Sequence, residues 1–129
     1  MLIEGTKYVA VTAVSEKLDG NNVFRFCDFH GFSIEGGHVD GAFIDCSFEN
    51  LEWYWTLFNS CLFVRCRIVS CEFRGIAFTD CRFVDCEFLG CRFLRNNLET
   101  VCTAKGARVY GSTAKECEGA DFLFAPDAV

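Results

Sequence analysis

Residues 71–95 read CEFRG-IAFTD-CRFVD-CEFLG-CRFLR, which are five consecutive groups of five residues with one shared pattern. The third position of each group is phenylalanine, and the first position is cysteine in four of the five. The same register extends without a break over residues 41–100. Its third positions are Phe43, Phe48, Trp53, Phe58, Phe63, Ile68, Phe73, Phe78, Phe83, Phe88, Phe93 and Leu98. An internal repeat this regular decides the architecture before any other feature of the chain.

A period of five fits neither a helix, which returns to one face every 3.6 residues, nor a long strand, which alternates every two. It fits a short extended piece followed by a corner. Within each group the first and third residues share one face, as strand alternation requires, and this pair is expected to point inward. Four such sides close a coil of about twenty residues, so residue n should lie above residue n − 20, with rungs ~4.8 Å apart.

The groups at 71–75, 81–85, 86–90 and 91–95 resemble the pentapeptide-repeat family, whose consensus is A(D/N)LXX, often with Phe at the centre and Cys at the preceding inward position. The resemblance covers residues 22–100 and extends in weaker form to 124. It implies an all-β fold, a right-handed quadrilateral β-helix of about four to five coils. Trp53 as a centre, and Thr56 and Asn96 at the small inward position, depart from the family pattern.

The chain divides into three segments. Residues 1–21 do not follow the repeat and are expected to form an N-terminal cap, with a strand-like run at 8–14. Residues 22–100 form the repeat, with its first coil one residue short near Asp40. Residues 101–129 are expected to form an irregular last coil with small centres, followed by a C-terminal cap or dimerisation segment. A short helix over 113–118 is the alternative to that last coil.

Eight of the ten cysteines occupy the same inward position of the repeat: Cys27, Cys46, Cys61, Cys66, Cys71, Cys81, Cys86 and Cys91. Cysteine behaves there as a small hydrophobic residue beside each phenylalanine. A straight column of thiols does not offer the tetrahedral arrangement that zinc requires. We therefore expect no metal and no cofactor, and reduced thiols indicate a cytoplasmic protein. Neither a signal peptide nor an apolar run long enough to span a membrane is found.

The charge pattern bears on two functions. The resemblance implies, as one possibility, a DNA mimic that binds a type II topoisomerase (DNA gyrase) and inhibits or protects it, and the net charge of −6 is compatible with this. Residues 41–100, however, hold eight acids and six arginines, whereas a DNA mimic needs dense anionic columns. No motif of a catalytic or phosphate-binding site occurs, so we expect neither an enzyme nor direct nucleic-acid binding. A non-catalytic scaffold or protein-interaction module is favoured, with DNA mimicry as the alternative.

The outward positions supply the candidate surface for an unknown protein partner. Apolar outward residues cluster in a ridge, and two aromatic residues lie outward on an early coil. These candidates are Ile44, Val64 and Val84 in one column, Val69 and Leu89 on the adjoining side, and Tyr54 and Trp55. We expect Val64 and Val84 to be covered by the C-terminal segment or by a second chain, since a contiguous apolar strip usually marks a covered or binding surface. Phe122, Leu123 and Phe124 are the candidates for self-association, and a homodimer is possible.

Overall fold

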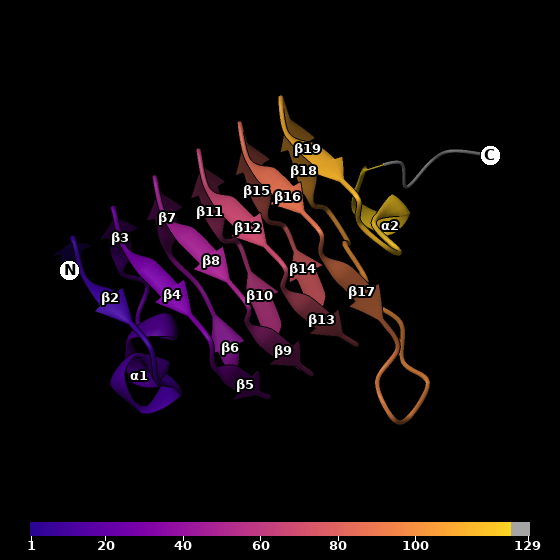
Figure 1. Cartoon of the computed structure of the whole chain (residues 1–129), viewed down its shortest axis with the longest axis horizontal. Coiled ribbons are helices and arrows are strands. Elements are labelled where there is room, and N and C mark those ends of the chain that lie inside the picture. Colours follow the sequence, from indigo (N-terminus) through magenta and orange to yellow (C-terminus); the bar gives the residue numbers. More distant parts are fainter. Residues whose placement is uncertain (125–129) are drawn as a thin grey trace.

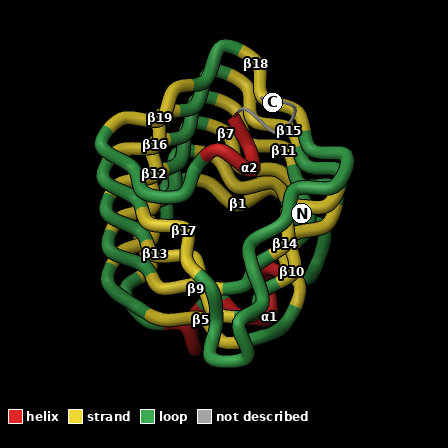
Figure 2. The backbone as a smooth tube through the Cα atoms, turned by 90° about the vertical axis from the view of Figure 1, so that its right-hand side faces the viewer, coloured by secondary structure: helices red, strands yellow, loops and turns green. Residues whose placement is uncertain are grey.

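The chain folds as a stack of parallel β coils, a solenoid of about five turns. The computed structural model describes residues 1–124. Figure 1 shows the coils stacked along the long axis, from the N-terminus to the C-terminal segment. Figure 2, turned by 90°, shows a four-sided ring whose sides are strands and whose corners are turns. Every strand pairing is parallel, so the backbone hydrogen bonds run from coil to coil.

The four sides of the ring are four sheets, which we name A to D. Sheet A holds β1 (Leu2–Glu4), β3 (Val23–Arg25), β7 (Ala42–Ile44), β11 (Leu62–Val64), β15 (Arg82–Val84) and β18 (Arg108–Tyr110). Sheet B holds β2 (Lys7–Tyr8), β4 (Asp28–His30), β8 (Ser47–Glu49), β12 (Arg67–Val69), β16 (Glu87–Leu89) and β19 (Thr113–Lys115). Sheet C holds β5 (Ser33–Glu35), β9 (Glu52–Tyr54), β13 (Glu72–Arg74) and β17 (Arg92–Leu94). Sheet D holds β6 (His38–Val39), β10 (Leu57–Asn59) and β14 (Ala77–Thr79).

The register between coils is the predicted one. Phe63 pairs with Phe43 on one side and with Phe83 on the other, twenty residues away in each direction. In the first coil Phe24 pairs with Phe43, nineteen residues on, and this confirms that the coil is one residue short. The expected all-β architecture of stacked five-residue sides is therefore confirmed.

The core consists of stacked aromatic columns. The rings of Phe63 and Phe83 stack with centroids 4.8 Å apart and an interplanar angle of 3°. Rings of neighbouring columns meet edge to face, as Phe78 and Phe83 do at 5.1 Å and 80°. Both geometries are favourable for aromatic pairs and add to the free energy gained by burial. Trp53 is tolerated as a centre, because it is buried and stacks on Phe73.

The eight repeat cysteines are all buried at the shared inward position, as predicted, and each is a free cysteine. Their thiols are also hydrogen bonded to the coil beneath. Cys66 Sγ donates to the carbonyl oxygen of Phe43 at 3.1 Å, and Cys86 Sγ donates to that of Phe63 at 3.3 Å. The small inward residue thus fills space and pairs with a backbone acceptor of the preceding coil.

Each corner requires a residue in the left-handed region of φ, two positions after the centre. Asp45, Trp55 and Arg65 have φ values of 52°, 60° and 50°. This conformation is uncommon for residues with a side chain and costs free energy at each corner, except where glycine occupies the position, as Gly75 does. The stacked sheets hold these corners in place, and the corner side chains project outward.

The N-terminal segment differs from the expected strand-like run at 8–14, which is wrong. Within that run only Tyr8, the last residue of β2, belongs to a strand. A 3-10 helix, η1 (Val11–Ala13), and α1 (Ser15–Leu18) follow it. β1 and β2 continue sheets A and B by one strand each, so residues 2–8 form half a coil. The two short helices bury Val14 and Leu18 where the other half of the coil would lie.

The predicted centre at Leu98 is wrong, because Leu98 is 68% exposed. Asn96 occupies the inward position before it, and its Oδ1 accepts hydrogen bonds from the backbone N–H groups of Leu98 and Thr100. This local turn diverts residues 97–101 into a loop, visible after β17 in Figure 1. The pairing resumes at Thr103, which bridges to Ala77, twenty-six residues away.

Beyond the loop the chain completes the last coil with small centres, as the first of the two sequence interpretations proposed. Val109 pairs with Phe83, and Ala114 pairs with Phe88. The alternative of a helix over 113–118 is wrong, since β19 lies there. A single helical turn, α2 (Asp121–Phe124), then covers the end of the coil. Within residues 1–124 no helix has the length and apolar character needed to cross a lipid bilayer.

Candidate functional site

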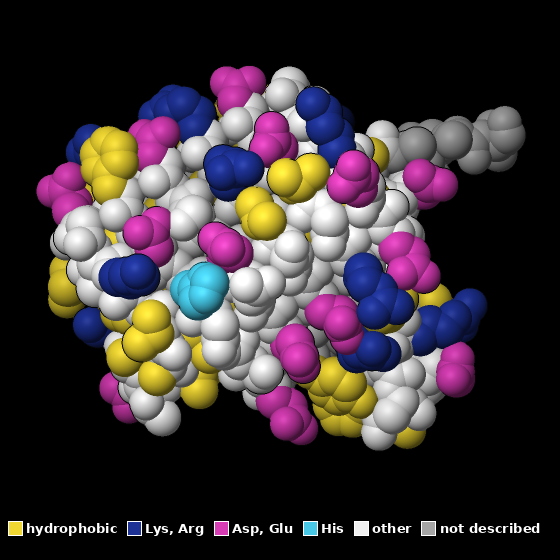
Figure 3. All heavy atoms as spheres, viewed as in Figure 1, with side chains coloured by type: hydrophobic (Ala, Val, Ile, Leu, Met, Phe, Trp, Pro, Cys, Tyr) yellow, Lys and Arg dark blue, Asp and Glu magenta, His cyan; other side chains and the backbone are white. Residues whose placement is uncertain are grey.

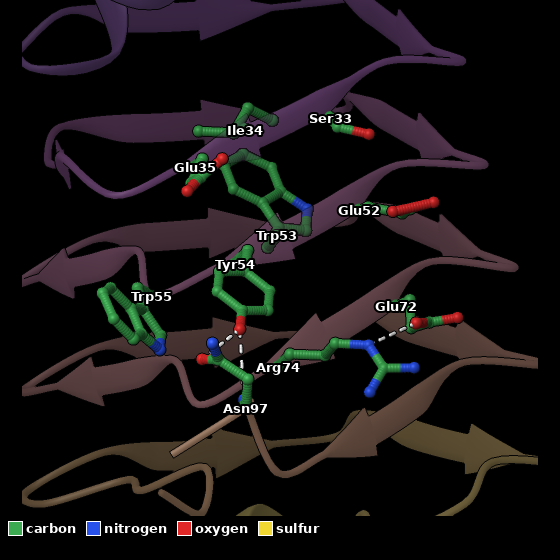
Figure 4. A pocket seen from close by; sticks show the side chains of 10 residues that line it. All are labelled: Ser33, Ile34, Glu35, Glu52, Trp53, Tyr54, Trp55, Glu72, Arg74 and Asn97. Atoms are coloured by element: carbon green, nitrogen blue, oxygen red, sulfur yellow. Dashed lines mark hydrogen bonds and ion pairs between the residues drawn. The ribbon is translucent and has the colours of Figure 1, made fainter.

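The outer face of sheet C carries a hollow of ≈ 330 Å³. Strands β5, β9 and β13 form its floor and sides, Trp55 follows at the corner after β9, and Asn97 reaches in from the loop after β17. Figure 4 shows these side chains around the hollow. The loop is therefore what distinguishes this side of the solenoid from a plain repeat surface, because its Asn97 adds a wall to an otherwise open sheet.

Two aromatic residues dominate the hollow. The rings of Tyr54 and Trp55 stack with centroids 5.5 Å apart, and Trp55 is 41% exposed. Tyr54 Oη donates to Asn97 Oδ1, and the backbone N–H of Asn97 donates to Tyr54 Oη at 3.1 Å. This pair of bonds joins residues 43 positions apart and anchors the loop to the sheet. The aromatic pair predicted as a partner surface is thus held in a defined arrangement.

The charges of the hollow are unevenly paired. Glu72 lies 2.7 Å from Arg74 Nε and 3.7 Å from Arg92, so its carboxylate is neutralised twice. Glu35 and Glu52 are exposed, and neither forms an ion pair or a side-chain hydrogen bond within residues 1–124. With three carboxylates and one guanidinium among its lining residues, the hollow carries a net negative charge.

The predicted apolar ridge is present but differs from the expectation. Ile44, Val64 and Val84 stack in one column of sheet A, and each is half-buried. The C-terminal segment does not cover them within the described residues. It extends the column, because Tyr110 of β18 pairs next to Val84 and is 48% exposed. Cover by a second chain remains a prediction.

Val69 and Leu89 lie on the adjoining side of the solenoid, as expected. They pair with each other on sheet B, one corner further along each coil. Arg67 and Glu87 form an ion pair, 3.4 Å apart, on the same two strands as Val69 and Leu89. The ion pair lies at the start of each strand, between the ridge on sheet A and these two apolar residues. Figure 3 shows the result on one face, where small apolar patches alternate with charged side chains.

Phe122, Leu123 and Phe124, the candidates for self-association, pack on their own coil. Leu123 is buried. The ring centroids of Phe122 and Phe93 lie 5.1 Å apart, and those of Phe124 and Phe88 lie 5.5 Å apart. Residues 121–124 thus cover the end of their own coil, while Phe122 and Phe124 stay half-buried. Residues 125–129 lie outside the described part of the chain, and self-association through this segment remains a prediction.

Arginines pair with about half of the acids on the repeat. Arg65 binds both carboxylate oxygens of Asp45, at 2.8 and 3.0 Å, and Arg92 Nε lies 2.9 Å from Glu118. The hydrogen bond from Arg65 lowers the pKa of the Asp45 carboxyl below its ordinary value. These two bridges run from coil to coil and interrupt the columns in which they lie, whereas acids such as Glu35 and Glu52 stay unpaired within residues 1–124.

No cluster of three His, Cys, Asp or Glu side chains in residues 1–124 is arranged to bind a metal ion. Burial keeps the repeat thiols away from a substrate, because each of them lies in the core. Hydrogen bonds with Cys46 and Cys86, and then burial, raise the pKa of the Cys66 thiol well above its ordinary value, whereas the bond with Cys66 lowers the pKa of Cys46 and of Cys86. Burial raises the pKa of the Cys102 thiol.

The sequence predicted Tyr54 and Trp55 as a partner surface but not the other lining residues, among them Glu35, Arg74 and Asn97. The register alone could have found the first two of these three. Glu35 pairs with Tyr54, and Tyr54 pairs with Arg74, so the column that contains Tyr54 was already fixed by the repeat. Asn97 carries no such signal, because it belongs to the loop that interrupts the register.

Comparisons with known proteins found distant structural matches alone. No protein-family model matches the sequence, and no curated protein sequence matches it. The structure of the pentapeptide repeat protein Rfr23 from the cyanobacterium Cyanothece 51142 matches with a TM-score of 0.49 and 4% identity, over 92% of this chain and 84% of that chain. A structure of QnrB1, a plasmid-mediated fluoroquinolone resistance protein, matches with a TM-score of 0.40 and 16% identity, over 87% of this chain and 57% of that chain. A second QnrB1 structure has a TM-score of 0.36 and 12% identity, over 90% and 68%.

The five-residue sides, the twenty-residue register and the inward Cys–Phe pairs are the decisive features. The chain has the pentapeptide-repeat fold. Its outer surface, with the hollow on sheet C, is where a function of this pentapeptide-repeat solenoid is to be sought, because nearly all inward side chains are spent on the core.

Proposed function

We propose that this protein is a non-catalytic repeat scaffold that binds another protein through the outer face of sheet C. The observation that carries the proposal is the stacked, exposed pair of Tyr54 and Trp55 beside a hollow, anchored by Asn97. Aromatic residues that are held rigidly and remain accessible are enriched at protein interfaces, because they bury much area at a small cost in conformational entropy.

The rigidity of the surface supports this role. Sheet C is bonded from coil to coil through β5, β9, β13 and β17, and its inward residues are buried. A partner therefore meets a preorganised surface and does not have to order it, which lowers the entropic cost of association. The free, buried thiols are consistent with a cytoplasmic protein, which we include in the proposal.

A photo-crosslinking amino acid at the edge of the hollow tests the proposal. Leu57 is 41% exposed, begins β10 two residues after Trp55, and does not line the hollow, so p-benzoylphenylalanine there leaves the surface intact. Arg82, exposed on the opposite sheet A, is the matched control. In the cells that make the protein, irradiation should give a discrete cross-linked species from position 57 and a much weaker one from position 82. Absence of any cross-linked protein at 57, or equal patterns at both positions, would contradict the proposal.

A further inference from the structure

The hollow on sheet C presents an aromatic surface that the fold leaves open. The rings of Tyr54 and Trp55 stack with centroids 5.5 Å apart, and Trp55 is 41% exposed. Trp53, by contrast, is an inward centre, because it is 3% exposed and stacks on Phe73 in the core. Figure 4 shows all three among the residues that line the hollow. An open aromatic stack favours a ligand with a cationic group that can lie against the rings.

The carboxylates on either side of Trp53 define the rest of that ligand. Glu52 precedes Trp53 on β9, while Glu35 lies on β5 beside Tyr54, with which it is in register. Arg74 is bonded to Glu72 and donates to the carbonyl oxygen of Arg95 at 3.5 Å, so it is not available to neutralise Glu35 or Glu52. The hollow thus offers two unpaired, negatively charged carboxylates, with two aromatic rings beside Glu35.

We infer that the hollow binds an arginine-bearing segment of the partner protein. The guanidinium of that arginine would lie against Tyr54 and Trp55 and pair with Glu35, because it is planar, stacks on aromatic rings and matches a carboxylate with two donors. A backbone N–H of the same segment would donate to Glu52, which is exposed on the neighbouring strand. This inference rests on the proposed function and specifies the chemistry of its partner.

The two tryptophans of the chain both line the hollow, which makes their indole N–H signals direct reporters in ¹⁵N-labelled protein. The signals are assigned with Trp55→Phe. The probe is the peptide acetyl-Gly-Arg-Gly-amide, added up to about 20 mM, where even a dissociation constant of about 1 mM gives near saturation. We expect saturable shifts of both indole signals, and none with the neutral isostere in which citrulline replaces arginine.

Matched variants localise the effect. Glu35→Gln with Glu52→Gln removes both free carboxylates without altering the shape of the hollow. The affinity for the arginine peptide should fall roughly tenfold, because two charge-assisted contacts on a partly exposed surface are lost. Glu49→Gln changes an exposed glutamate on sheet B and should leave binding unaltered. The inference would be overturned by unchanged binding in the double variant, by equal shifts with the citrulline peptide, or by the absence of any shift. Shifts with the neutral disaccharide cellobiose, and none with the arginine probe, would also overturn it.

The two proposals fail in different ways. The titration uses purified protein and a defined peptide, whereas the cross-link at position 57 requires a protein in the cell. A cross-link without binding of the arginine probe would overturn the inference and leave the scaffold role standing. Binding of the probe without any cross-linked protein would overturn the scaffold role.

Discussion

Phe83 illustrates how single residues sustain the solenoid. It is fully buried, stacks on Phe63 and meets Phe78 edge to face. Phe83→Ala should lower the free energy of unfolding by about 3–5 kcal/mol, because it removes buried surface and leaves a cavity that the stacked coils cannot close. Phe122→Ala, in the half-buried cap, should cost about 1–2 kcal/mol. Denaturant unfolding of both variants measures the difference, and equal losses would contradict the placement of the cap at the periphery of the core.

The cysteines behave as core residues in the same sense. Hydrogen bonds between neighbouring thiols raise the pKa values of Cys61 and Cys71 and lower those of their partners Cys81 and Cys91, so burial protects the whole set. Alkylation of the native protein should be slow, with Cys117, the least buried cysteine, reacting first. Denatured protein should report all ten thiols and no bound zinc. Stoichiometric zinc, or four or more thiols missing after reductant-protected purification, would be incompatible with this description.

At the scale of strands, the ion pairs between coils make the stability of the fold depend on pH in a definite direction. Arg65 lowers the pKa of Asp45, so the pair contributes stability above the unfolded pKa of the carboxyl and loses it as the pH falls through the lower, folded value. An NMR titration should place the Asp45 midpoint below that of an ordinary aspartate, about 3.9. In Arg65→Met the midpoint should return towards that value. An identical midpoint in both proteins would show that the bidentate pair does not form in solution.

Most of the sheet structure was predictable from the sequence, and the exceptions have local causes. The register of sheets A to D follows from one inward pair in every five residues, which specifies both pairing and face. Asn96 breaks it, because an amide at the inward position bonds its own backbone and ejects the loop. The helical turn at 15–18 escaped prediction since its sequence carries no repeat to compare with. The hollow depends on that loop, so the column that contains Tyr54 could be foreseen but its wall at Asn97 could not.

For the whole molecule, the distribution of charge separates the scaffold from a DNA mimic. Arg65, Arg67 and Arg92 each pair with an acid of the repeat or the last coil, which interrupts the anionic columns that would imitate phosphates. We therefore expect neither inhibition of DNA gyrase supercoiling nor protection of gyrase from quinolones at low micromolar protein. A supercoiling assay with and without a quinolone measures both effects, and clear activity in either arm would reverse the ranking of the two functions.

The central claim, that a partner protein binds the sheet C hollow through its free carboxylates, is tested most directly by the cross-linker at position 57 in two backgrounds. One protein keeps Glu35 and Glu52, and the other carries Glu35→Gln with Glu52→Gln, changes that leave the inward core untouched. Cross-linked yield is compared at equal amounts of folded protein. We predict a discrete cross-linked species in the first protein and a yield lowered several-fold in the second. Equal yields in the two backgrounds would contradict the claim.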